Sequence, residues 1–150
     1  MTFVSDVPES IRTKPGALTR EEWEALKQHS RIGYEKLRAI PSLSEVASIV
    51  HAHHERYDGK GYPRGLAGAE IPLAARIIAV IDSFFAMTND RPYRKALPPE
   101  VARGEILRNS GGQFDPEVVQ AFMAAYEAAS AARTSSEPRD DSLGEVRTTA

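Results

Sequence analysis

The stretch HAHHERYDGKGYP, residues 51–63, joins a histidine cluster to a glycine-rich loop, and the fold can be worked out by moving outward from it. Three of the chain's four histidines lie within residues 51–54. Gly59 and Gly61 allow positive φ and close backbone approach, and Pro63 stiffens the end of the loop. Clustered histidines are associated with metal sites, although a structural role is more common, and the glycines would serve equally well to stop a helix and form a turn. Both interpretations stay open on these residues alone.

The segment before this loop has helical spacing. Val46, Ile49 and Val50 form an apolar stripe that leads to His53, so His53 is predicted to point toward the core, where a histidine is more often structural than a ligand. His51 and His54 are three residues apart and are predicted to share one helix face. The pattern of a zinc protease, two histidines one turn apart with a glutamate beside the first, is absent.

Upstream of the cluster, two segments carry signals for the start of a helix. Thr19 and Glu22 form a capping box, with Leu18 and Trp23 at the positions of a hydrophobic staple, so a helix begins at Thr19. Residues 42–45, Ser-Leu-Ser-Glu, offer a second capping box before the Val46 stripe.

Downstream, three further helices are predicted. One opens with Pro72, another follows Pro98-Pro99, and the last begins at Asp115-Pro116 with aspartate as the N-cap. Apolar residues recur at helical spacing in the first and last of them: Leu73, Ile77, Val80, Ile81, Phe84 and Met87, then Val118, Phe122 and Tyr126, with Val119 and Met123 beside these. No stretch alternates with period two, so the predicted fold class is all-α with five or six helices.

Composition excludes several classes of protein. The 150 residues suit one domain, and 41% apolar with 27% charged residues is a soluble, globular balance. A formal charge of −2 argues against a DNA- or RNA-clamping protein, and the absence of cysteine excludes disulfide scaffolds and thiolate metal sites. The longest apolar run, Ile77–Ile81, is about a quarter of a membrane span. A cytoplasmic protein without a membrane segment or secretory signal is therefore expected.

The two ends of the chain differ from its body. Residues 133–150 are rich in charged and small polar residues, lack aromatic residues, and carry only Leu143 and Val146 as large apolar side chains. Such a segment buries too little surface to offset its conformational entropy, so a disordered tail is predicted, with a short partner-binding segment as the alternative. Residues 1–6 have no clear assignment, which leaves residues 7–132 as the folded domain.

Two polar features lie between the loop and the last helix. Asp82 is the one charged residue in the apolar segment 77–87, so it is expected to find a cation, for example Arg76, or hydrogen-bond donors. Arg91, Arg94 and Lys95 form a basic patch that could bind phosphate, although most such patches are simply solvated.

These residues together carry a family resemblance. The string from His53 to Pro63 resembles the signature of HD-GYP domains, which are metal-dependent phosphodiesterases of cyclic di-GMP signalling in bacteria. The resemblance covers roughly residues 7–125. It includes the segments Lys14–Thr19, Glu22-Trp23, His29 with Gly33, Glu70–Leu73, Ala79–Asp82, Asp90–Ala96, Gly111 and Phe114–Pro116.

The resemblance implies an HD-type helical bundle that hydrolyses cyclic di-GMP or a related cyclic dinucleotide with a divalent metal, iron or manganese. It assigns His29, His53, His54 and Asp82 as metal ligands. Gly61, Tyr62 and Pro63 would shape the pocket wall, and Arg91 and Arg94 would contact the nucleotide. His51 matches no ligand position. Signalling proteins are the other class of partner that it allows.

The chain also departs from the family pattern. The HDxGK segment that names the family should precede Val7-Pro8, but its aspartate and lysine positions hold Met1 and Val4, and its histidine position lies before Met1. Phe85 stands where the family usually has another aspartate. We therefore expect a partial bundle that holds a single ion and is inactive by itself. The alternatives are an enzyme whose true start lies upstream, a non-catalytic module that binds nucleotides or proteins, and a poorly folding remnant.

Overall fold

The computed structural model describes residues 7–90 and 94–136, and in that part of the chain the secondary structure is helical. The predicted all-α class is confirmed. The α-helices are α1 (Glu9–Arg12), α2 (Arg20–Arg38), α3 (Ser44–Ala52), α4 (Leu73–Thr88), α5 (Pro99–Arg108) and α6 (Pro116–Ser136), with 3₁₀ turns η2 (Pro41–Leu43) and η3 (Gly68–Glu70).

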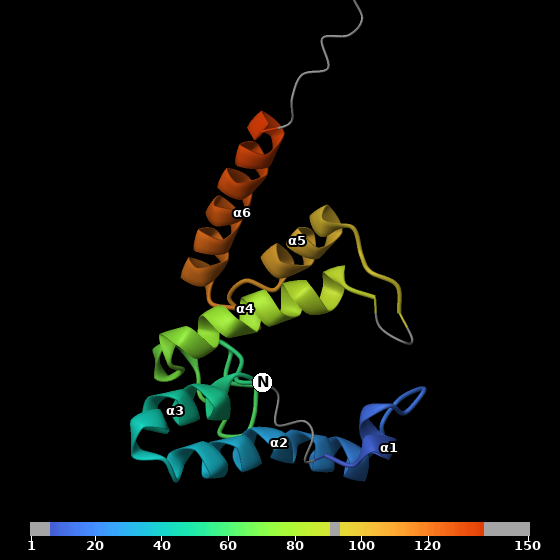
Figure 1. Ribbon diagram of the computed structural model, residues 1–150, viewed down its shortest axis with the longest axis vertical. Coiled ribbons are helices and arrows are strands. Elements are labelled where there is room, and N and C mark those ends of the chain that lie inside the picture. Colours follow the sequence, from blue (N-terminus) through green and yellow to red (C-terminus); the bar gives the residue numbers. More distant parts are fainter. Residues whose placement is uncertain (1–6, 91–93, 137–150) are drawn as a thin grey trace, which may run out of the picture.

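Helix α4 is the central element of the fold. It packs against α3 on one side and against α5 and α6 on the other, while α2 and α3 form a hairpin beside it (Figure 1). The main hydrophobic core lies between α4, α5 and α6, and a smaller cluster of Ala52, Ile71 and Ala75 joins α3 to α4. The residues of the main core are Val80, Ile106, Phe114, Val118, Val119 and Met123.

The helix starts follow local sequence signals, with one exception. Both hydrogen bonds of the Thr19–Glu22 capping box are present, and Asp115 accepts a hydrogen bond from the backbone N–H of Glu117, as its N-cap position predicts. The capping box predicted over residues 42–45 is wrong. Ser42 lies inside the 3₁₀ turn η2, so Leu43 occupies the N-cap position of α3 and makes no side-chain hydrogen bond there.

One face of α4 stays exposed. Leu73, Ile77, Ile81 and Phe85 are 39–60% accessible, and an apolar groove of about 410 Å³ runs between α4 and α6. Within the described residues, no helix has the length and apolar character needed to cross a bilayer.

The predicted domain limits, residues 7–132, stay a prediction. Helix α6 continues to Ser136, past residue 133, where the tail is predicted to start. The predicted uncertain start at 1–6, and the rest of the predicted tail at 137–150, lie outside the described residues.

A buried ion pair ties the first turn of α4 to the first turn of α6. Arg76 donates to Asp115 at 2.5 Å and also to the carbonyl of Ile71, and the Asp115 side chain is 2% exposed. We expect Asp115→Ala to lower the free energy of unfolding by about 3–5 kcal/mol, because it removes a helix cap and leaves a largely buried guanidinium without its partner. Urea denaturation measures the change.

The matched control for this substitution is Glu35→Ala, which breaks the exposed Arg31–Glu35 pair on α2. It should change stability by less than about 1 kcal/mol. Equal losses in the two variants would contradict the role given to Asp115.

Candidate metal centre

The α2–α3 hairpin brings three histidines together. His29 lies in the middle of α2 and is 5% exposed, while His53 and His54 follow directly after Ala52, the last residue of α3. The Nε2 atom of His29 lies 3.0 Å from Nε2 of His54 and 3.4 Å from Nε2 of His53. One ring nitrogen from each residue falls within 4.8 Å of the other two. The three imidazoles therefore converge on one point.

Backbone carbonyls fix two of these rings. Nδ1 of His29 lies 2.5 Å from the carbonyl oxygen of Leu26, and Nδ1 of His53 lies 2.6 Å from that of Val50. A carbonyl oxygen can only accept, so in both rings the proton sits on Nδ1. Each Nε2 then presents its lone pair to the shared point, which is how protein structure orients histidine ligands of metals.

Burial favours the neutral form of His53 and His54. It lowers the pKa of His54 to about 3, with the neighbouring His53 and His29 rings adding to the effect, and burial likewise lowers the pKa of His53. These two imidazoles are thus deprotonated at neutral pH. Neutral imidazole is the form that binds metal.

The spacing fits a metal ion. With metal–nitrogen bonds of about 2.1 Å, two nitrogen ligands lie about 3.0 Å apart at an octahedral angle and about 3.4 Å apart at a tetrahedral angle. The Nε2 atom of His29 lies 3.0 Å from that of His54 and 3.4 Å from that of His53, which match these two ligand spacings. The Nε2 lone pairs of His29 and His53, 3.4 Å apart, repel unless a cation or a proton lies between them. The donor set suits a divalent ion of the first transition row.

Asp82, the fourth predicted ligand, is not one of the three converging residues, although its charge acts on His53 and partly offsets the lowering of that imidazole's pKa by burial. It sits on α4 and lines the same pocket as His53 and His54, but its carboxylate is not among the atoms that converge with the imidazole nitrogens. The expectation that a buried Asp82 pairs with a cation such as Arg76 is wrong: Asp82 is exposed and Arg76 pairs with Asp115. The reason is that Asp82 lines an open pocket and is accessible to solvent, so burial does not require a partner.

Hydrogen bonds made by the loop's own polar residues set the shape of the loop after the histidines. Glu55 is 4% exposed and accepts hydrogen bonds from the backbone N–H groups of Arg64 and Leu66. Asp58 accepts two hydrogen bonds from Arg56, which lower the pKa of Asp58 to about 2. These contacts close the loop on itself and place Gly61 and Tyr62 beside the cluster.

The two glycines of the loop serve different purposes. Gly59 has a φ of +76°, whereas Gly61 is needed for space, because a Cβ there would lie 2.3 Å from the backbone nitrogen of Arg56. Tyr62 then stacks on the His54 ring at 4.9 Å, and burial raises the pKa of Tyr62 to about 12. Gly61 and Tyr62 therefore line the pocket, while the neighbouring Pro63 is exposed and is not among its lining residues.

The pocket around the cluster has a volume of about 570 Å³ and walls suited to a charged aromatic ligand. Trp23, 45% exposed, meets Tyr62 edge to face at 6.3 Å. Two cations, Lys27 and Lys60, line the same pocket, and the Lys27 ammonium lies 5.8 Å from the Tyr62 ring centre. Aromatic rings stack on nucleobases, and ammonium groups attract phosphates.

Sequence reasoning missed these wall residues. From the sequence, Trp23 has a role only in a hydrophobic staple and Lys27 has none, although Trp23 and Lys60 lie in segments that carry the family resemblance. The spacing of Trp23 and Lys27, four residues apart on α2, puts them on one helix face and was the available signal.

The remaining predicted residues are placed as follows. Arg94 is exposed and lines a neighbouring pocket, and Arg91 lies outside the described residues. His51 stacks on Tyr34 at 4.4 Å, away from the cluster. The predicted shared face of His51 and His54 is therefore wrong, because α3 ends at Ala52 and the chain turns before His54.

Comparison with known proteins identifies a family and several relatives of this chain. Residues 4–118 match the family model described as HD domain. The chain is 50% identical over 119 residues to a cyclic di-GMP phosphodiesterase of Thermotoga maritima, and 44% identical over 119 residues to the cyclic di-GMP phosphodiesterase response regulator RpfG of Xanthomonas campestris. Each alignment covers 78% of this chain and 32% of the relative. A 3'3'-cGAMP-specific phosphodiesterase 2 of Vibrio cholerae is 37% identical over 131 residues, 86% of this chain and 25% of that protein.

A solved structure shares the fold. The crystal structure of a cyclic GMP-AMP-specific phosphodiesterase of V. cholerae aligns with 85% of this chain and 33% of its own, with a TM-score of 0.58 and 20% sequence identity. The chain thus spans about a third or less of the length of these relatives. With the matched family model and the confirmed HD-GYP resemblance, the chain belongs to the HD domain family.

Proposed function

We propose that this chain binds one divalent metal ion, iron or manganese, through His29, His53 and His54, and binds a cyclic dinucleotide beside it, as part of a cyclic dinucleotide phosphodiesterase. The convergence of three imidazole nitrogens, two of them from residues that line a pocket with aromatic and cationic walls, carries this proposal. The relatives named as cyclic di-GMP and 3'3'-cGAMP phosphodiesterases support the class of ligand.

Different residues of the site would bind the metal ion, the phosphates and the bases. A divalent ion held by the imidazoles would supply Lewis-acid chemistry, polarising a phosphate oxygen and lowering the pKa of water. Lys27 and Lys60 would attract the phosphates electrostatically, and Trp23 and Tyr62 would stack on the bases. The Nδ1–H groups of His29 and His53, held by backbone carbonyls, keep the two Nε2 lone pairs directed into the site.

We further propose that the 150-residue chain binds its ligand without hydrolysing it. Within the described residues the cluster has three imidazoles, and Asp82 is the one carboxylate of the pocket that is free to turn toward them, because Glu55 is held by the loop backbone. Metal-assisted phosphodiester cleavage often uses paired ions joined by shared ligands. Three imidazoles and one carboxylate are enough ligands for one ion. A non-catalytic nucleotide-binding module is thus the second candidate function.

The test incubates the purified chain with Mn²⁺ or Fe²⁺ and cyclic di-GMP, following binding by calorimetry and products by chromatography. We expect metal-dependent binding without linear dinucleotide or GMP. Appearance of these products would overturn the proposed inactivity and support the phosphodiesterase function. Absence of binding to both cyclic di-GMP and 3'3'-cGAMP in the presence of metal would overturn the proposed function.

A further inference from the structure

The glycine-rich loop is joined by backbone hydrogen bonds to the connection between α5 and α6. The N–H of Asp58 donates to the carbonyl of Gly112 at 2.9 Å, and the N–H of Tyr57 donates to the carbonyl of Gln113 at 3.2 Å. Because α3 and α5 pack on different sides of α4 (Figure 1), these contacts connect the part of the fold that holds the histidines to the part that holds the main core.

An ion pair between Arg56 and Asp58 lies at this joint. Nε and Nη2 of Arg56 donate to the two carboxylate oxygens of Asp58 at 3.1 and 2.8 Å, a fork that fixes the plane of the guanidinium. The remaining nitrogen of Arg56, Nη1, donates to Oε1 of Gln113 at 3.5 Å. A Cβ at Gly112 would lie 3.9 Å from Nη2 of Arg56 and 4.0 Å from Oδ2 of Asp58, so the ion pair packs against the α5–α6 connection.

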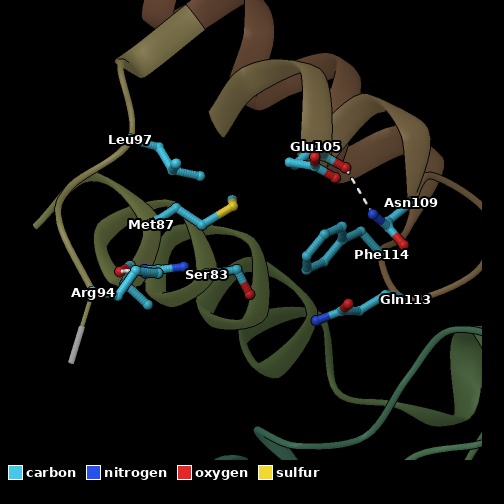
Figure 2. A pocket seen from close by; sticks show the side chains of 9 residues that line it. Ser83, Met87, Arg94, Leu97, Glu105, Asn109, Gln113 and Phe114 are labelled. Atoms are coloured by element: carbon cyan, nitrogen blue, oxygen red, sulfur yellow. Dashed lines mark hydrogen bonds between the residues drawn. The ribbon is translucent and has the colours of Figure 1, made fainter. Parts of the chain in front are cut away.

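Gln113 contributes its side chain to the wall of the metal pocket, which it lines together with His53 and His54. Figure 2 shows the neighbouring pocket that Gln113 also borders, with the Gln113 side chain extending toward α4 and its amide nitrogen at the end nearer to Ser83. A guanidinium can only donate, so Oε1 of Gln113 faces Arg56 and the Nε2 group is left to donate to a ligand. Glutamine amides are among the groups that bind the phosphate oxygens of nucleic acids.

We propose that Arg56 is a positioning residue, which holds the Gln113 amide in place to donate to a phosphate oxygen of the cyclic dinucleotide, while Asp58 orients Arg56. The inference rests on the proposed function. Arg56 itself lines the pocket, but two of its nitrogens are engaged by Asp58 and the third faces Gln113. Arg56 therefore acts on the ligand through Gln113 and not by direct contact.

A double-mutant cycle tests this role, with cyclic di-GMP affinity measured by calorimetry on the full chain with Mn²⁺. We expect Arg56→Gln and Gln113→Ala each to weaken binding about tenfold, the size expected for a lost hydrogen bond to a charged group. The double variant should lose no more than about twofold beyond either single variant, because both substitutions remove the same contact. Mn²⁺ affinity should stay within about twofold of wild type in all three variants, since neither residue belongs to the histidine cluster.

Arg31→Gln is the matched control, because it removes the same charge and also breaks an ion pair, with Glu35 on α2, but does not touch the pocket. Its cyclic di-GMP affinity should stay within about twofold of wild type. Additive losses in the double variant, about 100-fold in total, would mean that Arg56 contacts the ligand directly and would overturn the inference. Unchanged affinity in either single variant would also overturn it, and both results leave the proposed function standing.

A second measurement needs no ligand and applies if no cyclic dinucleotide binds, a result that would overturn the proposed function. The order of the Gln113 side-chain amide is measured by ¹⁵N relaxation in the free chain. We expect a rigid amide in the wild type and in Arg31→Gln, and a mobile amide in Arg56→Gln. Equal order in the three proteins would overturn the positioning role of Arg56.

Discussion

Replacing His54 with alanine should abolish tight metal binding. His54 supplies one of three converging imidazole nitrogens, 3.0 Å from that of His29, so its loss leaves a two-nitrogen site open to water. Losing a hydrogen-bond partner of a ligand already costs 10–100-fold in metal affinity, so we expect loss of a ligand to cost more than about 100-fold. Titration calorimetry with Mn²⁺ measures the change, with circular dichroism as the check that α2 and α3 remain folded.

His51→Ala is the matched control for this prediction. It removes a histidine three residues away whose ring stacks on Tyr34 and is not part of the convergent cluster. Its Mn²⁺ affinity should stay within about twofold of wild type, since no ligand changes. If the two variants bind Mn²⁺ equally well, the metal is held elsewhere.

Replacing Gly61 with alanine should destabilise the domain and close the nucleotide pocket. The added Cβ would lie 2.3 Å from the backbone nitrogen of Arg56 and 2.6 Å from Cα of Glu55, and backbone atoms cannot turn away as a side chain can. The loop must therefore move, together with Tyr62, whose N–H donates to the carbonyl of His54. We expect a loss of about 2–3 kcal/mol in unfolding free energy, measured by urea denaturation, and loss of dinucleotide binding.

Gly104→Ala provides the comparison. Gly104 lies inside α5 with open space around its Cα, so alanine there should stabilise the helix by about 0.5–1 kcal/mol. An unfolding midpoint for Gly61→Ala equal to wild type would contradict the close approach.

The contrast between these positions shows what the sequence can predict. The Thr19–Glu22 capping box and the Asp115 N-cap are local, because every hydrogen bond joins residues two or three apart, and both were predicted correctly. For Gly61 the residue type alone predicts that another part of the backbone approaches closely. Which backbone atoms it approaches depends on how the loop folds over Glu55.

The candidate site was harder to predict because its parts are distant in sequence. His29 and His54 are 25 residues apart, and their contact exists only because α2 and α3 pack together. Helical spacing alone predicts that His54 shares a helix face with His51. This is wrong because α3 ends at Ala52. The family resemblance groups His29, His53 and His54 with Asp82, and the role of Asp82 as a ligand stays a prediction.

The most direct test of the central claim is a crystal structure of the chain soaked with Mn²⁺, with anomalous scattering used to locate the ion. The account predicts one peak about 2.1 Å from the Nε2 atoms of His29, His53 and His54. A chain that binds no manganese, or a peak held by Asp82 without the three imidazoles, would contradict it.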